Sequence, residues 1–550
     1  MLRGESMRLG KSSTVALLLF LVSLNLLLRY PQTPHELDYD GFVFHGMTIS
    51  LVQEGYAEWI IHPLSYFGLY PLSHPSGGLF ALAGWSEVSG MSLEGAILLF
   101  DLAVVIVGLL GAFVLSMEIR RDEVLAFVVS AAFSLAPRFV TSLMWSVPAR
   151  TLFTALIPLF IWLVLRWQRT HDSRYMILIP FVLLLMMSAH RLTVLMGILL
   201  IAFILTMVLL AAARTLRIRF ASRVLSPSFR RISNAAVFGA FAVVLVAILV
   251  AGGVLSQYSS GQLGVGSGVL KELTNFGVSL TRSIGFLSPL VPLGIVVTYR
   301  RRAKEFKEPF LLMILVVIAP TLTLRQYTGF YIIPFSAVFI GVGLLWILEK
   351  MRFRVLKVAA LAGAVVMMSA SAVYVVGYDL QSAPYVDDLS YTHGLYVLYN
   401  VHDTVISNDG VLGSKIFLVS GHAYLPVGGA TTAFQSPELL IFGFVDRSNL
   451  RIYPVPLADL TVDSDTPFSL DGVQAEADWV QILDHTPSSV PTSLWTTYSP
   501  RYLAESWDTW GGYTAYGKVY GSRFISAVHA ENYKIFEIRG QTLWFVGGAT

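Results

Sequence analysis

Apolar residues along the chain are grouped in long blocks that are separated by short polar segments. A membrane-spanning helix needs about 20 predominantly apolar residues to cross roughly 30 Å of hydrocarbon. About eleven blocks have this character. They lie near residues 13–30, 94–117, 124–139, 151–166, 176–190, 192–213, 234–253, 283–298, 309–324, 330–348 and 355–376. The pattern therefore predicts a mainly α-helical, polytopic membrane protein.

The first block has two interpretations. Arg3, Arg8 and Lys11 precede it, as basic residues precede the apolar run of a secretory signal peptide. The segment from Asn25 to Pro31 shows no cleavage site of small residues, however. An uncleaved membrane anchor is therefore the preferred interpretation.

Lysine and arginine are concentrated in alternate connections between the blocks. Cytoplasmic loops of membrane proteins carry an excess of these residues. The basic segments are the N-terminus and residues 120–121, 166–174, 214–231, 299–307 and 350–357. Placing all of them inside requires an odd number of spans. We therefore predict a multi-pass protein of the cell membrane with a cytoplasmic N-terminus and an extracytoplasmic C-terminus.

Three parts of the chain then face outside: residues 31–93, 254–282 and the tail 377–550. In the tail, strand-like runs alternate with helix-like patterns, which is typical of a small α/β domain. The strand-like runs are 404–407, 478–483 and 533–538, and the helix-like patterns are 411–420 and 437–444. The predicted organisation is a transmembrane domain over 1–376 and an extracytoplasmic α/β domain over 377–550.

Composition excludes several classes of protein. Only 13% of the residues are charged and 55% are hydrophobic, with a mean hydropathy of +0.66, whereas a soluble domain carries about 25% charged residues. The formal net charge of +3 gives no argument for nucleic acid as a partner. The chain has no cysteine, which excludes disulfides, thiolate metal sites and cysteine nucleophiles.

Three acids stand close together after the first block: Glu36, Asp38 and Asp40. An amphipathic stretch follows them, and a helix on the bilayer surface is one form that it can take. A carboxylate at this boundary can act as a general base, or it can hold a divalent cation against a leaving phosphate. The alternative is that Asp38 and Asp40 only cap that helix.

A second stretch lies about thirty residues further on and reads Tyr70-Pro-Leu-Ser-His-Pro-Ser-Gly-Gly78. Together with Asp40, it resembles the first outer loop of the catalytic subunit of oligosaccharyltransferase. The resemblance implies the GT-C fold of polyprenyl-phosphate-dependent membrane glycosyltransferases, with about eleven transmembrane helices and an outer C-terminal domain. It places Asp40 on the catalytic aspartate and leaves Asp38 as a second candidate. It also implies a divalent cation, Mn²⁺ or Mg²⁺, with Asp40 as a ligand.

Other outer loops offer basic and acidic candidates. His190 and Arg191 form a pair in a short turn that can bind a phosphate or anchor the turn at the interface. The resemblance adds Arg325 as a contact of the donor phosphate, and Glu272 as an acid from a loop over the substrate. Asp101, inside the second block, is either a functional intramembrane acid or half of a structural ion pair with a nearby arginine or histidine.

The chain departs from the family at two motifs. The loop 137–150 has arginines and a tryptophan where the family has a second acidic motif. In Val405-Ile-Ser-Asn-Asp-Gly410, only Asp409 remains of the Trp-Trp-Asp acceptor motif. The first departure puts a metal requirement in doubt, and the second puts recognition of an Asn-x-Ser/Thr peptide in doubt.

The sequence thus predicts an inverting membrane glycosyltransferase. Its donor is a sugar or oligosaccharide on a polyprenyl phosphate or pyrophosphate, and its acceptor is a protein, lipid or polysaccharide on the outer face. Membrane lipids are its other partners, and nucleic acid is not one. Two alternatives stay open, namely a noncatalytic scaffold with the same fold and a transporter or flippase of lipid-linked sugars.

Overall fold

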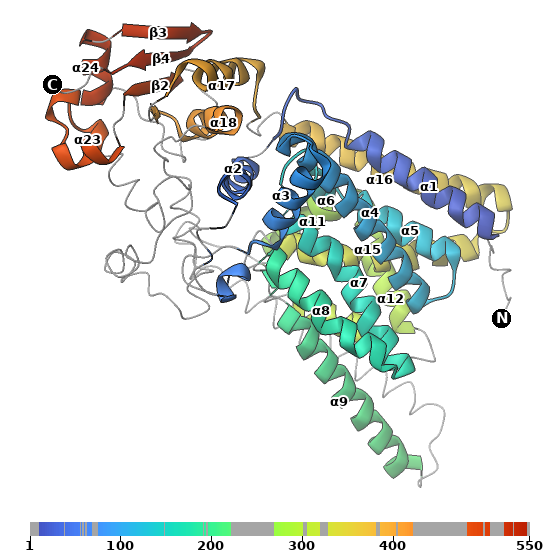
Figure 1. Ribbon diagram of the computed structural model, residues 1–550. Helices are drawn as coiled ribbons and strands as arrows, with labels where there is room; N and C mark the ends of the chain where they lie inside the picture. Colours follow the sequence, from blue (N-terminus) through green and yellow to red (C-terminus); the bar gives the residue numbers. More distant parts are fainter. Residues whose placement is uncertain are drawn as a thin grey trace.

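The structure is a computed structural model of the 550-residue chain. It describes residues 10–37, 39–55, 57, 60, 63–68, 75–147, 149–190, 192–193, 196–221, 269–300, 305–318, 328–380, 385–402, 405–421, 481–498, 501–506, 522–531 and 533–546. Long helices form one body, and a small sheet with its own helices forms the tail beside it (Figure 1).

Five described helices have the length and composition to cross a membrane. They are α1 (Lys11–Leu28), α4 (Leu93–Ile119), α7 (Ala149–Thr170), α15 (Thr328–Lys350) and α16 (Arg354–Leu380). Further apolar helices accompany them, namely α5 (Glu123–Ser134), α8 (Ser173–Ala189), α9 (Met196–Ala221), α12 (Leu290–Arg300) and α13 (Lys307–Ile318). These helices overlap every predicted block except 234–253, which lies outside the described residues. The mainly helical, multi-pass membrane architecture is confirmed.

Two predicted blocks are interrupted by local backbone chemistry. The block 124–139 divides because α6 (Pro137–Thr141) starts anew at Pro137, whose ring and missing N–H prevent continuation of α5 but suit a first helical position. The block 283–298 begins at the end of α11 (Val269–Ile284). Gly285 follows with a φ of +90°, a left-handed conformation that ends a helix readily, and α12 starts at Leu290.

Small residues let the helices of the body approach closely. A Cβ added at Gly294 of α12 would collide with the backbone oxygen of Phe339 in α15. At Gly108 of α4 it would lie 2.7 Å from the ring of Phe133 and 3.2 Å from Ala155 of α7. Such contacts are typical of helix packing in membranes, where van der Waals contact replaces the hydrophobic effect between helices.

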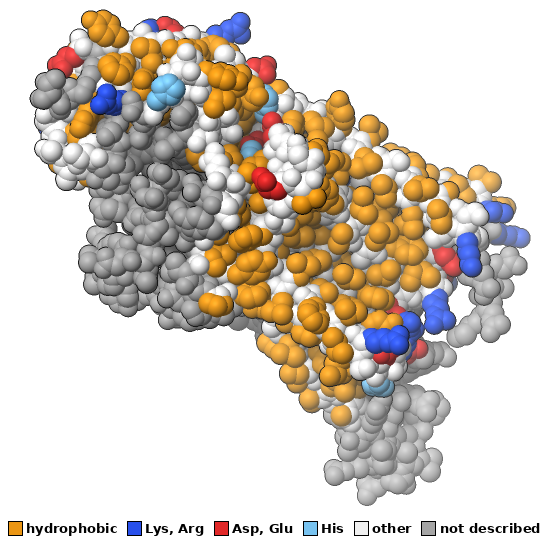
Figure 2. Space-filling view, viewed as in Figure 1, with side chains coloured by type: hydrophobic (Ala, Val, Ile, Leu, Met, Phe, Trp, Pro, Cys, Tyr) orange, Lys and Arg blue, Asp and Glu red, His pale blue; other side chains and the backbone are white. Residues whose placement is uncertain are grey.

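The charged ends of several helices lie together at one end of the body. Arg120, just after α4, donates to Glu349 near the end of α15 at 2.7 Å. Glu118 of α4 pairs with Arg166 and Arg169 of α7 at 3.2 and 2.9 Å. Figure 2 shows hydrophobic side chains over the body, and Lys and Arg side chains gathered at its end away from the tail.

The tail contains a four-stranded sheet in the order β1-β2-β4-β3. Its strands are β1 (Val405–Ser407), β2 (Tyr502–Ser506), β3 (Tyr533–Ile538) and β4 (Gln541–Phe545); β1 is parallel to β2, and the other pairs are antiparallel. The described helices of the tail are α17 (Asp388–Asn400), α18 (Gly410–Ser420), α23 (Thr492–Tyr498) and α24 (Arg523–Glu531). An α/β tail is therefore confirmed.

Individual elements of the tail were predicted with mixed success. The strands near 404–407 and 533–538 and the helix near 411–420 are present as β1, β3 and α18. The strand predicted over 478–483 is wrong for residues 481–483, which are helical, with Ile482 and Leu483 in a buried cluster. A short apolar run cannot be assigned to strand or helix by its periodicity alone. The helix predicted over 437–444 lies outside the described residues.

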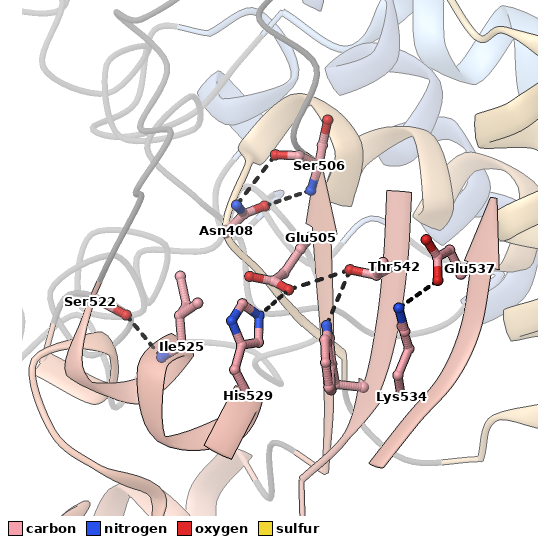
Figure 3. A network of polar contacts seen from close by, with 10 residues as sticks. Asn408, Glu505, Ser506, Ser522, Ile525, His529, Lys534, Glu537 and Thr542 are labelled. Carbon is pink, nitrogen blue, oxygen red and sulfur yellow. Dashed lines mark hydrogen bonds and ion pairs between the residues drawn. The ribbon is translucent and has the colours of Figure 1, made fainter. Parts of the chain in front are cut away.

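A buried polar network joins α24 to the sheet (Figure 3). Glu505 of β2 is fully buried, and its Oε2 lies 2.7 Å from Nε2 of His529 in α24 and accepts from Oγ1 of Thr542 in β4 at 3.3 Å. The Asn408 Oδ1 accepts from the Ser506 backbone N–H at 3.0 Å, which ties the end of β1 to β2. Buried polar groups of this kind fix one arrangement of elements, because unpaired alternatives are costly.

The segment between α1 and α4, predicted to be the first outer loop, contacts both the body and the tail. It contains α2 (Tyr39–Glu54), η1 (Pro63–Tyr66) and α3 (Gly77–Ser89). In Figure 1, α2 lies between the body and the pair α17 and α18. Phe42 of α2 is buried in a cluster with Val386, Leu418 and Val419 of the tail. The loop that carries the acidic candidates is thus packed against both parts of the molecule.

Candidate active site

Position 40 lies in the first turn of α2, the helix that follows the first apolar helix. The predicted helix after the acidic cluster is therefore present. The structure describes the backbone at position 40 but not the direction of the Asp40 side chain, and Asp38 lies outside the described residues. The catalytic roles of both acids remain predictions.

The loop between α6 and α7 holds the chain on either side of position 40. The Leu37 backbone N–H donates to the Trp145 carbonyl at 2.9 Å. A Cβ at Gly41 would lie 2.9 Å from the Ser146 hydroxyl oxygen, so a larger residue would displace this loop. The Trp145 indole N–H donates to the Glu94 carbonyl at 2.9 Å, which anchors the loop on α4.

Asp101 of α4 forms a hydrogen bond with the backbone of this loop. The side chain is fully buried in α4, and its Oδ2 accepts from the Ser146 backbone N–H at 3.1 Å. Trp145, one residue before, has a φ of +60°, which is strained for a residue with a side chain. Asp101 thus stabilises a loop conformation that the backbone does not favour by itself. Through Ser146, Asp101 thus holds the part of the loop that lies against Gly41, the residue next to Asp40.

Gly77, near the end of the Tyr70–Gly78 stretch, lies against the C-terminal end of α8, which precedes His190. A Cβ at Gly77 would collide with Ser188, whereas at Gly78 it would be 3.8 Å from Leu152. His190 follows α8 as its C-cap residue, and its Nδ1 accepts from the Leu192 backbone N–H at 3.0 Å. The structure therefore packs Gly77 against Ser188, two residues before His190. Arg191 and the residues 70–74 lie outside the described residues.

The start of α15 lies beside α6 on the same side of the body. The Arg138 guanidinium lies 4.6 Å from the ring centroid of Phe330, and a Cβ at Gly329 would lie 2.9 Å from its Nη1. Arg325, shortly before α15, lies outside the described residues. Glu272 is in α11, which packs against α6 and α15, but its side chain is not described. Segments from distant parts of the sequence, α11 and the start of α15, thus meet at α6.

The described residues do not form a carboxylate site for a metal. No group of three Asp, Glu, His or Cys side chains in the described ranges is placed to hold an ion. The loop between α6 and α7 supplies no acid, and the carboxylate behind it, Asp101, is engaged with Ser146.

The residues at the place of the acceptor motif have structural roles. Asn408 is fully buried on Ser506, and the Ser407 hydroxyl donates to the Asp409 carbonyl at 2.8 Å. These bonds form the turn from β1 into α18. Sequence reasoning singled out Asp409 and the loop that contains Trp145 and Ser146, but it assigned no role to Gly41, because a glycine carries no chemical signal until its neighbours are known.

Comparison with known proteins gives a match by fold and none by sequence. No family model and no curated protein matches the chain. The oligosaccharyltransferase of Archaeoglobus fulgidus, tethered with an acceptor peptide containing the NVT sequon, superimposes with a TM-score of 0.55 and 12% identity, over 90% of this chain and 69% of that one. The chain has the GT-C fold. The fold class expected from Asp40 and the Tyr70–Gly78 stretch is thereby confirmed.

Two further structures support the GT-C fold. The same archaeal enzyme, AglB, in complex with an inhibitory peptide and a dolichol-phosphate, gives a TM-score of 0.52 at 11% identity, over 90% of this chain and 69% of that one. Arabinofuranosyltransferase AftD from Mycobacteria gives 0.51 at 10% identity, over 100% of this chain and 41% of that one. Identities this low show the fold and leave the reaction to be argued from residues.

Proposed function

We propose that the chain is an inverting membrane glycosyltransferase that acts at the outer membrane face. Its donor is a sugar or oligosaccharide on a polyprenyl phosphate or pyrophosphate. Its acceptor is a group on a protein, lipid or polysaccharide. The observation that carries the proposal is the position of residue 40, in the first turn of a helix held between the body and the loop 142–147 of a GT-C fold.

In the proposed reaction, the Asp40 carboxylate accepts the proton of the acceptor group. The acceptor oxygen or nitrogen then forms a bond to the anomeric carbon of the sugar, while the bond from that carbon to the phosphate oxygen breaks. The electron pair of the broken bond stays on the phosphate oxygen. Attack from the face opposite the leaving group inverts the anomeric centre. A positioned general base contributes typically 10²–10⁴-fold to such a rate.

Basic side chains are proposed to bind the leaving phosphate. Arg325, Arg191 and His190 are the candidates; His190 follows the end of α8, and Arg325 precedes α15 in the sequence. Arginine suits this role because its guanidinium forms two parallel hydrogen bonds to phosphate oxygens. Glu272 remains a candidate acid of a loop over the substrate, and the requirement for Mn²⁺ or Mg²⁺ is a question for the assay.

The organisation proposed with this function has the transmembrane domain in residues 1–376 and the extracytoplasmic domain in 377–550. The N-terminus is cytoplasmic in this arrangement. Two observations support it. The tail packs on α2, and the clustered basic side chains of Figure 2 lie at the other end of the body. Acceptor and lipid-linked donor would then meet on the same side of the membrane.

The experiment is a transfer assay with the purified full-length protein and a radiolabelled polyprenyl-linked sugar. It is run with Mn²⁺, with Mg²⁺ and with a chelator, and it compares the wild type with Asp40→Ala. Transfer that depends on Asp40 supports the proposal. Movement of the labelled lipid across a bilayer without transfer would indicate a flippase, and neither activity would indicate a noncatalytic scaffold.

The noncatalytic scaffold is the second candidate because of one specific observation. The loop between α6 and α7 has no acidic side chain where the family has its second acidic motif, and Asp101 behind it holds the loop. A scaffold would keep the packing of α2 on the tail and lack transfer under every metal condition.

A further inference from the structure

A cavity of about 610 Å³ lies between α2, the turn from α3 to α4, and the tail helices α17 and α18. A volume of this order is typical of small-molecule sites. The charged residues in its wall are Glu36, Glu87, Glu94 and the histidines 35 and 45. No lysine or arginine is among the residues that line it. Figure 2 shows acidic and histidine side chains where the tail meets the apolar body.

Glu36 is a buried acid at the centre of this wall. Its side chain is 2% exposed, and Oε1 lies 2.6 Å from Nδ1 of His45. Its other oxygen, Oε2, has no hydrogen-bond partner among the described residues. A buried carboxylate with an unpaired oxygen carries a desolvation cost that a nearby positive charge would reduce.

Glu94 supplies a second carboxylate that a ligand can reach, because its side chain is 28% exposed. Its Oε1 lies 3.0 Å from Nδ1 of His35 and accepts from the Glu36 backbone N–H at 3.3 Å. The His35 ring stacks on Tyr391 of α17, with ring centroids 4.0 Å apart. The acids are thus held in place by contacts from both the first outer loop and the tail.

The cavity is distinct from the proposed catalytic position. The residues of α2 that line it are at positions 45, 49, 52 and 53. At 100° per residue, these positions lie about 120° to 220° around the helix from position 40. The cavity therefore occupies the opposite face of α2 and does not share the face on which position 40 lies.

We propose that this cavity binds a primary ammonium group. The net negative wall favours a cation, and Ile49, Val52, Leu418 and Val419 offer apolar contact for the carbon chain or ring that bears it. A metal ion fits less well, since the described residues contain no group of three ligands placed to hold one. A lysine side chain and an amino sugar share this chemistry, so both are tested as sources.

The test measures binding to the purified full-length protein by isothermal titration calorimetry. The probes are Nα-acetyl-lysine amide and glucosamine, and the uncharged controls are Nα,Nε-diacetyl-lysine amide and glucose. We expect saturable binding of at least one amine and at least tenfold weaker binding of its control. The amine that binds identifies the source. Binding should also weaken with ionic strength, because the attraction is electrostatic.

Variants then locate the site. Glu94→Gln keeps the shape of the wall and should weaken amine binding at least fivefold, and Glu87→Gln should add to that loss. Glu349→Gln removes one carboxylate from the other end of the body and should leave binding unchanged.

Absence of saturable amine binding, equal binding of the uncharged controls, or unchanged binding in Glu94→Gln and Glu87→Gln would each overturn the proposal. Binding of Zn²⁺ or Mn²⁺ in place of the amines would overturn it in favour of a metal site. None of these outcomes depends on transfer activity, so the cavity and the proposed function fail separately.

Discussion

At the scale of single residues, burial and hydrogen-bond partners decide which acids and histidines are free to react and which have a structural role. In the sequence, Asp101 was either a functional intramembrane acid or half of a structural ion pair; in the structure, it is buried and accepts from the Ser146 backbone N–H. His393 had no apparent role in the sequence, and in the structure it is fully buried in α17, where burial lowers its pKa. Sequence could name the residue types, but it could not supply burial or partners that come from segments far along the chain.

The first prediction concerns Asp101. Replacement by leucine removes the acceptor for the Ser146 N–H and should lower stability by about 1–3 kcal/mol, the usual cost of an unpaired buried polar group. Asp101→Asn keeps an acceptor oxygen and should cost less. Thermal midpoints in one detergent compare the two variants. Equal midpoints for Asp101→Leu and the wild type would show that the loop does not need this bond.

The second prediction concerns His393. Burial lowers the pKa of His393 to about 4, although the hydrogen bond with Gln541 opposes this shift. The unfolded chain takes up a proton near pH 6.5, but the folded chain does so only near pH 4. Stability should therefore fall as the pH drops from about 6.5 to about 4, by roughly 3 kcal/mol in total.

The check is the thermal midpoint of the tail as a function of pH. His393→Phe, which retains a ring beside Phe536, should flatten the dependence over this window. His402→Gln changes an exposed histidine and should leave the dependence as in the wild type. Parallel curves for His393→Phe and the wild type would contradict the assignment.

At the scale of elements, apolar length predicted most helices, and local backbone chemistry placed their ends. The blocks could not reveal that Pro137 starts a new helix or that Gly285 ends one within a predicted span. The β1 and β3 strands were predictable, because β1 begins with two β-branched residues, and four of the six residues of β3 are aromatic or β-branched. Residues 481–483 were not, since packing in a buried cluster decides between helix and strand for so short a run.

The third prediction tests the contact between α3 and the end of α8. Gly77→Ala should push Ser188 and the His190 turn away, at a cost of about 1–3 kcal/mol for overpacking. Gly78→Ala is the matched control, because its new methyl group would meet only Leu152 at an ordinary distance of 3.8 Å. Thermal midpoints and transfer rates should fall for Gly77→Ala and stay near wild type for Gly78→Ala. Identical behaviour of the two variants would contradict the packing described.

At the scale of the whole molecule, the segment between α1 and α4 packs against both the helical body and the tail. Sequence predicted a body of membrane-spanning helices and a separate C-terminal domain, from the apolar blocks and from one resemblance. It could not predict that α2 packs on α18 or that a cavity forms between them, because both depend on contacts across more than 300 residues of chain. The division of the chain at residue 376 stays a prediction.

The fourth prediction concerns orientation. The chain has no cysteine, so single cysteines can report which side of the membrane a residue faces. Ser488→Cys in the tail should react with a membrane-impermeant maleimide in intact cells. Ser173→Cys, at the start of α8, should react only after the membrane is permeabilised. The reverse pattern would place the tail in the cytoplasm.

The most direct test of the catalytic account is turnover by Asp40→Asn in a reconstituted bilayer with a radiolabelled polyprenyl-linked sugar. The account predicts a loss of at least about 10²-fold in turnover with little change in binding of the polyprenyl phosphate, since a base acts on the acceptor proton and not on the lipid. Asp388→Asn, an exposed charge change on α17, should transfer like the wild type. Wild-type turnover by Asp40→Asn would contradict the central claim.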